Sequence, residues 1–336
     1  MVKFLVIRFS SIGDIVLTTP VVRGLKQQVK DAQVHFLTKP AFVSILQENP
    51  HIDKIHSLSG IQNETVNGLK QENFDYVIDL QNNLRSLDIK RSLKRMYFTV
   101  NKLNVRKWLL VNLRINMLPE KHIVDRYLET TQLFDVKDDG LGLDYFIPAD
   151  EEVTPDQLPG THQEGYIAVV IGANHQTKKM PLSKLTALCD RLEHPSVLIG
   201  GPEDKAQGEQ LAASQPGKPV LNGCGSWSIN QSASVIQNAS VVITHDTGMM
   251  HIASAFRKPV LTIWGNTVPA FGMYAYKPGS GSDHFEVEGL SCRPCSKLGK
   301  PACPKKHFRC MADQDTDSIA RKANAIFRQG NHFTAQ

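Results

Sequence analysis

Residues 3–14 read KFLVIRFSSIGD, and residues 166–174 read YIAVVIGAN. Each stretch begins with a short apolar run and passes into a loop of small or polar residues, and an amphipathic segment follows. In a doubly wound α/β domain, this is the pattern of a buried parallel strand that leads through a βα turn into a helix. Because the pattern starts twice in one chain, it indicates two such domains.

The same pattern continues outward from both stretches. It predicts strands at 3–9, 34–37, 54–56 and 74–80, then at 166–171, 196–199, 241–244 and 260–264. It predicts helices at 14–28, 61–71, 84–94, 104–115 and 122–134, then at 181–192, 203–214, 228–238, 248–256 and 315–328. Between 135 and 163 the chain contains three prolines and little periodicity, which is typical of a boundary.

Strands that alternate with helices predict parallel sheets, so the expected fold class is α/β, with two Rossmann-like doubly wound domains that face a central cleft. The expected domains are residues 1–155 and residues 160–312. A C-terminal helix within 313–330 is expected to pack back on the N-terminal domain.

Composition excludes several classes of protein. With 336 residues, 41% of them hydrophobic and 21% charged, the chain is too apolar for a disordered protein and large enough for two cores. No apolar run approaches the roughly 18 residues of a membrane span, and Arg8 interrupts the first one before it reaches the ~7–15 residues of a signal-peptide core. We therefore expect a cytoplasmic protein.

Positive charge is concentrated in one segment. The formal net charge is +5, yet residues 85–126 contain eleven Lys and Arg against three acids, which gives +8 there and −3 elsewhere. So mild an overall charge does not indicate a nucleic-acid partner. The segment is either a basic binding surface or a solvated helical face.

Two common nucleotide-binding motifs are absent from the sequence. No G-x-G-x-x-G follows a predicted strand, and no G-x-x-x-x-G-K-[ST] occurs. A nicotinamide dehydrogenase or a P-loop kinase is therefore disfavoured.

The βα turn after the first strand carries Ser10, Ser11, Gly13 and Asp14. Ligands of doubly wound sheets bind at the carboxyl ends of the strands, and Gly13 permits close approach of the backbone. Asp14 is thus a candidate catalytic carboxylate. The alternative is that these side chains only cap the following helix, since Ser and Asp are favoured caps.

A second candidate loop is His245-Asp246-Thr247-Gly248-Met249-Met250-His251, again between a predicted strand and a helix. The N-terminus of that helix suits a phosphate, and Asp246 suits a neutral sugar hydroxyl because a carboxylate repels pyrophosphate. His251 is either a ligand contact or a core histidine.

The loop that follows the strand at 166–171 includes Ala173, Asn174 and Lys178. Its lysine is placed to meet a phosphate, and the alternative is an ordinary solvated loop. The turn Gly200-Gly201-Pro202-Glu203 after the next strand carries a weaker signal of the same kind.

Taken in order, these motifs resemble the ADP-heptose:lipopolysaccharide heptosyltransferases, glycosyltransferase family 9. The matching elements are Ser10 to Asp14, Asp79 to Ser86, His122 to Tyr127, Lys178 with Pro181, Gly200 to Glu203, Asp246 to His251, and the late Cys- and Pro-rich segment. The ordered set covers nearly the whole chain, although no single motif is decisive.

The resemblance implies a GT-B architecture and inverting transfer of a heptosyl residue from an ADP-sugar to the inner core of lipopolysaccharide. Asp14 matches the proposed general base, and Lys178 matches the lysine that faces the pyrophosphate. The implied donor residues are Ala173, Asn174, Glu203, Trp227, Asp246, Thr247, Gly248 and His251. The implied acceptor-side residues are Ser10, Ser11, Gly13 and Arg85.

Its implied partners are an ADP-sugar donor, an anionic lipopolysaccharide core acceptor and peripherally the inner membrane, with no nucleic acid. No cofactor is implied, and no D-x-D metal pair stands near the donor loop. Met180 replaces an aromatic of many relatives, and Asn82-Asn83 is a variant element. These departures leave the donor sugar and the acceptor position open.

The spacing Cys292-x2-Cys295-x7-Cys303-x6-Cys310, with His307 nearby, leaves open a tetrahedral zinc site, reduced packing cysteines or disulfides. Two other functions also stay open. One is a different sugar-nucleotide enzyme of the 2-epimerase type, which needs no lipid acceptor. The other is a binding module without transfer, which the presence of both Asp14 and Lys178 disfavours.

Overall fold

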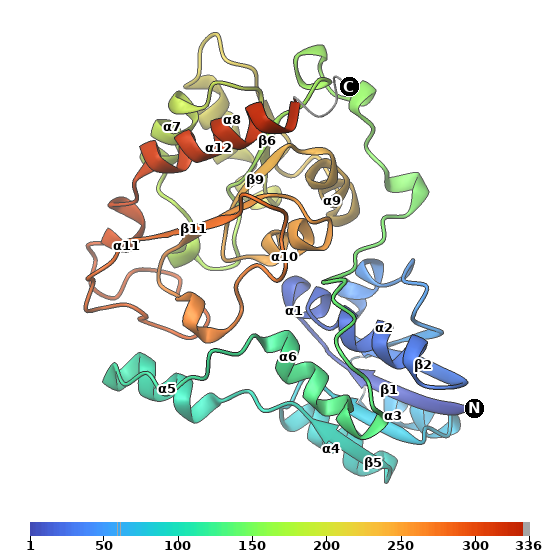
Figure 1. Ribbon diagram of the computed structural model, residues 1–336. Coiled ribbons are helices and arrows are strands. Elements are labelled where there is room, and N and C mark those ends of the chain that lie inside the picture. The colour runs from blue at the N-terminus through green and yellow to red at the C-terminus, as the bar shows by residue number, and fades with distance from the viewer. Residues whose placement is uncertain (59, 61, 332–336) are drawn as a thin grey trace. The chain divides into compact units, whose positions relative to one another are not determined.

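The computed structural model describes residues 1–58, 60 and 62–331. The chain forms two compact units. The first contains residues 1–104 and 119–146, and the second contains residues 105–118 and the chain from 147 onward. Each unit is built on one sheet of parallel strands with helices packed on it (Figure 1). The predicted fold class is therefore confirmed at the level of each unit.

The first sheet has the order β3-β2-β1-β4-β5, and all of its pairs are parallel. Its strands are β1 (Val2–Ile7), β2 (Ala32–Thr38), β3 (Lys54–Ser57), β4 (Tyr76–Asp79) and β5 (Met96–Thr99). The central strand β1 is apolar from Phe4 to Ile7 and buried on both faces, as expected for a parallel strand covered on two sides.

The helices of the first unit are α1 (Ile12–Val16), α2 (Thr19–Gln28), α3 (Gln62–Gln71), α4 (Leu84–Leu93) and α6 (Ile123–Leu128). α3 and α4 share a hydrophobic core with one face of the sheet. The single helix predicted over 14–28 is in fact two helices. Pro20 lacks an N–H and its ring would clash with the carbonyl of Val16, so the first helix ends before it.

The second sheet has the order β11-β10-β9-β6-β7-β8, again with parallel pairs throughout. Its strands are β6 (Ile167–Val170), β7 (Ser196–Ile199), β8 (Val220–Asn222), β9 (Val241–His245), β10 (Val260–Trp264) and β11 (Asp283–Glu286). β5, β8 and β11 were not predicted. Each is a short edge strand with several exposed or half-buried residues, so none produces a continuous apolar run.

The helices of the second unit are α5 (Asn104–Leu113), whose first residue belongs to the other unit, α7 (Leu182–Arg191), α8 (Lys205–Ala213), α9 (Ile229–Asn238), α10 (Gly248–Ala255), α11 (Arg309–Ala312) and α12 (Thr316–Asn331). Two hydrophobic cores lie on the two faces of the sheet. α7, α8 and α12 contribute to one, and α9 and α10 contribute to the other. The result is a three-layer unit.

The C-terminal helix forms where it was predicted, but its packing differs from the expectation. Ile319, Ala320, Ala323, Ile326 and Phe327 belong to the hydrophobic core of the second unit. Its helix α12 lies against α7 and β9 of that unit (Figure 1). The apolar stripe of α12 covers the second sheet, whereas we expected it on the N-terminal domain.

The segment 105–118 also differs from the expected division at residues 155–160, because it belongs to the second unit. The Lys107 ammonium lies over the ring of Phe271, 5.7 Å from its centroid. The Arg114 guanidinium donates hydrogen bonds to the main-chain oxygens of Ser291, at 2.9 Å, and Pro294, at 2.5 Å. These contacts join positions more than 160 residues apart, which no local pattern reveals.

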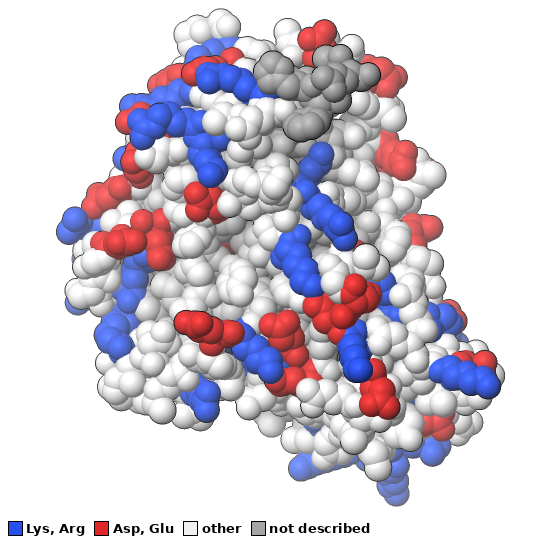
Figure 2. Space-filling view, in the orientation of Figure 1, with Lys and Arg blue, Asp and Glu red and all other residues white. Residues whose placement is uncertain are grey.

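Positive and negative side chains are interspersed on the face shown in Figure 2. Part of the basic segment 85–126 is also withdrawn from solvent, because Lys90, Lys107 and Arg126 are buried. Among the described residues, no helix combines the length and the apolar character that a membrane span requires.

Candidate functional site

The first unit reverses its strand order between β1 and β4, so the loops after these two strands meet at the carboxyl edge of the sheet. A pocket of about 460 Å³ lies at this place. It is lined by Phe9, Ser10, Lys39, Gln81, Asn83, Leu84 and Arg85. Two of the residues predicted for the acceptor side, Ser10 and Arg85, therefore line one pocket. Exposed Lys39 adds a second positive charge to it.

A buried ion pair organises the loop after β4. The Asp79 carboxylate is fully buried and accepts a hydrogen bond of 2.8 Å from the Lys90 ammonium. It also accepts from the Ser86 hydroxyl and from the main-chain N–H groups of Gln81 and Asn82. With its position fixed in this way, Gln81 accepts a 2.9 Å hydrogen bond from the N–H of Phe9 and joins the two loops.

Asp14 lies on the first turn of α1, with its side chain 21% exposed. Its carboxylate is 2.5 Å from the guanidinium of Arg8 and accepts hydrogen bonds from the N–H and the hydroxyl of Ser11. Burial raises the pKa of Asp14, but the Arg8 charge and the Ser11 hydrogen bonds outweigh it and hold the pKa below its usual range. Asp14 is thus ionised at neutral pH.

Both sequence interpretations of Asp14 have a counterpart in this geometry. Its bond to the Ser11 N–H is the return half of a capping box, which supports the structural role. The carboxylate is partly exposed and ionised, and Arg8, which holds it, also donates to the main-chain oxygen of the pocket residue Ser10, which supports the role of a base. Ser11 is itself exposed, whereas Gly13 is buried within α1.

Arg8 was overlooked as a functional residue by sequence reasoning. It is buried, and besides Asp14 it donates to the main-chain oxygens of Leu80, at 2.7 Å, and Ser10, at 2.9 Å. The available signal was a cation within an otherwise apolar strand. Tyr127 belongs to one of the matching elements but was not predicted as a site residue. Burial raises its pKa to about 12, and it lies near enough to Arg8 and Asp14 to interact with both charges.

In the second unit, the strand order reverses between β6 and β9, and the two main donor candidates meet there. The Lys178 ammonium is 2.6 Å from the Asp246 carboxylate and 3.0 Å from the Asp246 main-chain oxygen. The same carboxylate oxygen accepts from the Thr267 hydroxyl at 2.8 Å. Both members of the pair are partly exposed, Lys178 by 17% and Asp246 by 14%.

The N-terminus of α10 begins directly beside this ion pair. Thr247 is its N-cap, and the Thr247 hydroxyl lies 3.3 Å from that of Thr244. Gly248 is the first helical residue, and His251 is buried one turn later. The free N–H groups of a helix N-terminus favour an anion, so the edge combines a cation with an anion-binding helix end.

His245, at the end of β9, is buried behind the pair. Its Nε2 accepts a 3.1 Å hydrogen bond from the N–H of Met180. Burial lowers the pKa of His245 to about 4, with Lys179 adding to the effect, so the ring is neutral at physiological pH. Met180, which stands where many relatives have an aromatic residue, is buried. Its main-chain N–H joins the loop that carries Lys178 to the end of β9.

Contacts between successive loops extend this edge to the other predicted donor residues. The Lys179 ammonium is 2.5 Å from buried Asp204, in the turn after β7. A Cβ at Gly225, after β8, would lie 2.9 Å from the Cα of Pro202 in that turn. Glu203, in the same turn, is exposed.

Trp227 and the loop after β6 complete the predicted donor set. The Trp227 ring is half-buried and packs so closely on Gly223 that a Cβ there would overlap it. Ala173 is half-buried and Asn174 is exposed. The printed contacts thus bring Lys178, Asp246 and the start of α10 together, while Glu203 and Trp227 lie on neighbouring loops of the same sheet edge.

The late cysteines are free thiols. Cys292, Cys295 and Cys303 are half-buried and Cys310 is buried. The Cys292 sulfur lies 3.8 Å from Nε2 of His307. Within the part of the chain that the structure describes, only His35, His56 and Glu72 form a group of three or more metal-type ligands with all ligand atoms within 4.8 Å.

Comparison with known proteins gives consistent results. Residues 64–302 match the model of glycosyltransferase family 9 (heptosyltransferase). The chain is 24% identical over 288 residues to lipopolysaccharide heptosyltransferase 1 of Campylobacter coli, which covers 79% of this chain and 84% of that protein.

Two solved structures share the fold. A glycosyl transferase of family 9 from Veillonella parvula has a TM-score of 0.77 at 17% identity, and 97% of each chain is covered. The Escherichia coli ADP-heptose lps heptosyltransferase II has a TM-score of 0.72 at 17% identity, with 97% of this chain and 99% of that one covered. The two-unit architecture is therefore of the GT-B type.

Proposed function

This chain belongs to glycosyltransferase family 9, and from that premise we propose that it transfers a heptosyl residue from ADP-heptose to the inner core of lipopolysaccharide. The observation that carries the proposal is the edge of the second sheet, where Lys178, Asp246 and the N-terminus of α10 meet at the switch point. It combines an anion site with a carboxylate that can hold sugar hydroxyls. The relatives from Campylobacter coli and Escherichia coli named above are heptosyltransferases.

The donor half of the reaction requires stabilisation of a departing diphosphate. The Lys178 ammonium pairs with Asp246 in the free protein, and its 17% exposure leaves it within reach of solvent. We expect it to turn toward the pyrophosphate, while Thr267 continues to hold Asp246 through its hydroxyl. As the bond between the anomeric carbon and the phosphate oxygen breaks, Lys178 and the N–H groups of α10 neutralise the developing charge on ADP.

The acceptor half requires a base. Asp14 is ionised and partly exposed, so it can take the proton of an acceptor hydroxyl while that oxygen forms the new bond to the anomeric carbon. The low pKa that keeps Asp14 charged also makes it a weak base. Its contribution therefore depends on orientation, which the Arg8 and Ser11 contacts fix.

The acceptor is proposed to be the anionic core of lipopolysaccharide. The pocket between Ser10 and Arg85 carries two exposed cations, Lys39 and Arg85, and its remaining side chains are uncharged. Carboxylate or phosphate groups of a core acceptor would be attracted to these charges. A 2-epimerase has no acceptor to hold, and a binding module needs no catalytic base, so the cationic acceptor pocket beside Asp14 supports neither alternative.

We further propose that the protein works at the cytoplasmic face of the inner membrane and touches it through the segment 105–118. Its large apolar side chains are unusually exposed: Val105 by 74%, Trp108 by 56%, Leu113 by 53%, Ile115 by 49% and Met117 by 55%. Exposed Arg106 lies among them, and apolar side chains beside a basic one are typical of segments that bind an anionic lipid surface.

Co-sedimentation with vesicles tests the membrane proposal. We expect binding to vesicles that contain phosphatidylglycerol, weaker binding to purely zwitterionic ones, and a loss of binding in Trp108→Ser. Leu141→Ser, at another exposed apolar side chain, is the control. Equal binding of wild type and Trp108→Ser would contradict it.

An assay of ADP release tests the transfer itself. We expect release from ADP-heptose only when a lipopolysaccharide core acceptor lacking the relevant heptose is present, together with acceptor of increased mass. Release of ADP without acceptor, with a free epimerised sugar, would identify the epimerase alternative. Binding of ADP-heptose with no release under either condition would identify a binding module.

A further inference from the structure

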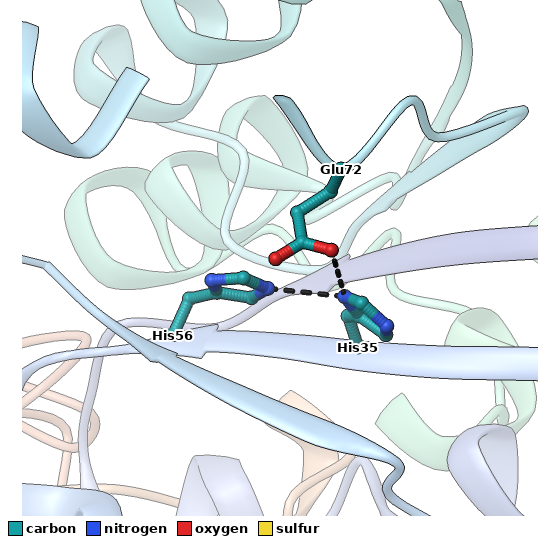
Figure 3. A group of neighbouring side chains, drawn as sticks. All are labelled: His35, His56 and Glu72. Atoms are coloured by element: carbon teal, nitrogen blue, oxygen red, sulfur yellow. Dashed lines mark hydrogen bonds and ion pairs between the residues drawn. The ribbon is translucent and has the colours of Figure 1, made fainter. Parts of the chain in front are cut away.

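Three side chains outside the proposed sugar-transfer site converge on one face of the first sheet. His35 lies on β2, His56 lies on β3, and Glu72 directly follows α3. In the β2–β3 register, Leu37 is paired with His56, which makes His35 and His56 diagonal neighbours on the same face. Figure 3 shows the three side chains pointing toward one another.

The distances between their ligand atoms are close to those of a metal site. Nδ1 of His35 lies 3.1 Å from Nε2 of His56 and 3.9 Å from Oε2 of Glu72. Zinc binds imidazole nitrogen at ~2.0–2.1 Å in tetrahedral geometry, which separates two ligand atoms by about 3.3 Å. The two nitrogens are near that separation already. The Glu72 carboxylate, 18% exposed, needs to approach Nδ1 of His35 by roughly half an ångström to meet the same ~3.3 Å spacing, and the ligand atoms of all three residues lie within 4.8 Å of one another.

The surroundings hold both imidazole rings in place. His35 is only 4% exposed, and its ring meets that of Phe74 edge to face at 5.2 Å between centroids. The His56 ring meets Phe74 in a similar way at 6.1 Å. Burial of the two rings lowers the pKa of both, that of His56 to about 4.

Charges of both signs lie next to the group. Lys54 pairs with Glu72 at 2.5 Å, and the Lys3 ammonium donates to the Glu72 main-chain oxygen at 3.2 Å. The nearby negative charges are Glu72 itself and Asp53, and Asp53 is paired with Lys26 at 2.6 Å. The Lys54 side chain is 55% exposed, so its ammonium can move away from Glu72 into water. Glu72 is then free to bind the ion, and no buried unpaired charge is left.

We propose that His35, His56 and Glu72 bind one divalent transition-metal ion of the zinc class, with water completing the coordination. Imidazole nitrogens exclude magnesium and calcium as preferred occupants, since those ions take oxygen ligands. The ion would join β2, β3 and the end of α3, in addition to the ion pair that already links Lys54 of β3 to Glu72. The site is separate from the heptosyl-transfer proposal and stands without it.

Calorimetric titration of the chelator-treated full chain with Zn²⁺ tests the proposal. We expect wild type to bind one equivalent that His56→Gln and Glu72→Gln lose or bind at least tenfold more weakly. His51→Gln, a half-buried histidine of the same unit outside the group, should keep it. Zinc should also raise the melting temperature of wild type and His51→Gln but not that of His56→Gln.

The cysteines at 292–310 are a second possible destination for zinc, and they are unchanged in all of these variants. Equal binding by wild type, His56→Gln and Glu72→Gln would place the ion on the thiols and overturn the proposal. Histidine-ring ¹⁵N spectra of wild type give a test that needs no variant. Zinc must shift the ring signals of His35 and His56, and unchanged signals would leave only a hydrogen bond between two imidazoles.

Discussion

The switch points of the two sheets are each built around an ion pair, but the two pairs expose their charges differently. At the first, the cation of the ion pair is the more buried partner: the side chain of Arg8 is 7% exposed and that of Asp14 is 21% exposed. At the second, Lys178 and Asp246 are almost equally exposed. The first edge therefore presents the Asp14 carboxylate to solvent, with the buried Arg8 guanidinium as its partner. The second edge presents both the Lys178 ammonium and the Asp246 carboxylate. One edge suits proton removal, and the other suits a charged sugar nucleotide.

The largest expected effect comes from removing the negative charge of Asp14 at the first edge. Asp14→Asn should lower kcat by about 10²–10⁴-fold, the usual contribution of a positioned base, while ADP affinity stays nearly constant. Steady-state kinetics and ADP titration measure the two quantities. Asp88→Asn, on an exposed part of α4, is the matched control.

The helix-cap interpretation of Asp14 makes the opposite prediction. Asn caps a helix about as well as Asp, so a purely structural Asp14 would allow near-normal turnover in this variant. Melting temperatures of wild type and variant must agree for the kinetic result to be assigned to chemistry.

Removing the cation of the second edge should have the next largest effect. Lys178→Met is expected to lower kcat by roughly 10²–10³-fold, because a fixed positive group no longer stabilises the departing diphosphate. It should also weaken ADP binding, which Asp14→Asn should not do. Lys205→Met, at an exposed lysine of α8, should behave as wild type. Unchanged ADP affinity in Lys178→Met would remove this lysine from the donor site.

The pH profile sharpens the contrast between the edges. The folded-state pKa of Asp14 lies below its unfolded value of ~3.9, so the base form and the stability it contributes persist above that value and are lost only as the pH falls through the folded pKa. The acid limb of kcat/KM due to Asp14 should therefore lie below about pH 4. In Arg8→Gln the cation is lost while burial remains, so the limb should move to higher pH.

Arg91→Gln, at an exposed arginine of α4, should leave that limb in place. An identical acid limb in wild type and Arg8→Gln would show that Arg8 does not set the charge of Asp14. If Arg8→Gln also has a lower melting temperature, the expected shift of the acid limb of kcat/KM to higher pH is unchanged.

The smallest effect is expected from salt. Exposed charges are screened within ~8 Å at physiological ionic strength, so added salt should raise the acceptor KM more than the donor KM. Arg85→Gln should raise the acceptor KM and reduce its salt dependence, whereas Arg91→Gln should not. If salt raised the acceptor KM and the donor KM equally, the exposed cations of 85–126 would be only a solvated surface and would not take part in acceptor binding.

Much of each edge was predictable because the relevant signals are local. Asp14, Lys178 and Asp246 each follow an apolar run at the carboxyl end of a strand, and in parallel sheets those ends share one side. The pairing of Lys178 with Asp246 was not predictable, because 68 residues separate them. Likewise Lys90 counted as a basic surface charge, whereas it neutralises buried Asp79.

The sequence alone determined where most of the strands and helices form, that they repeat as two α/β units, and which loops carry candidate side chains. Only the tertiary structure decided which unit received α12 and the segment 105–118, how Arg8 comes to hold Asp14, and that His35, His56 and Glu72 meet. The physical reason is that the spacing of apolar side chains along a helix or strand shows which of its faces is buried, and this spacing can be read from the element's own residues. Which segment covers that face depends on the packing of distant parts of the chain, and that information is not local.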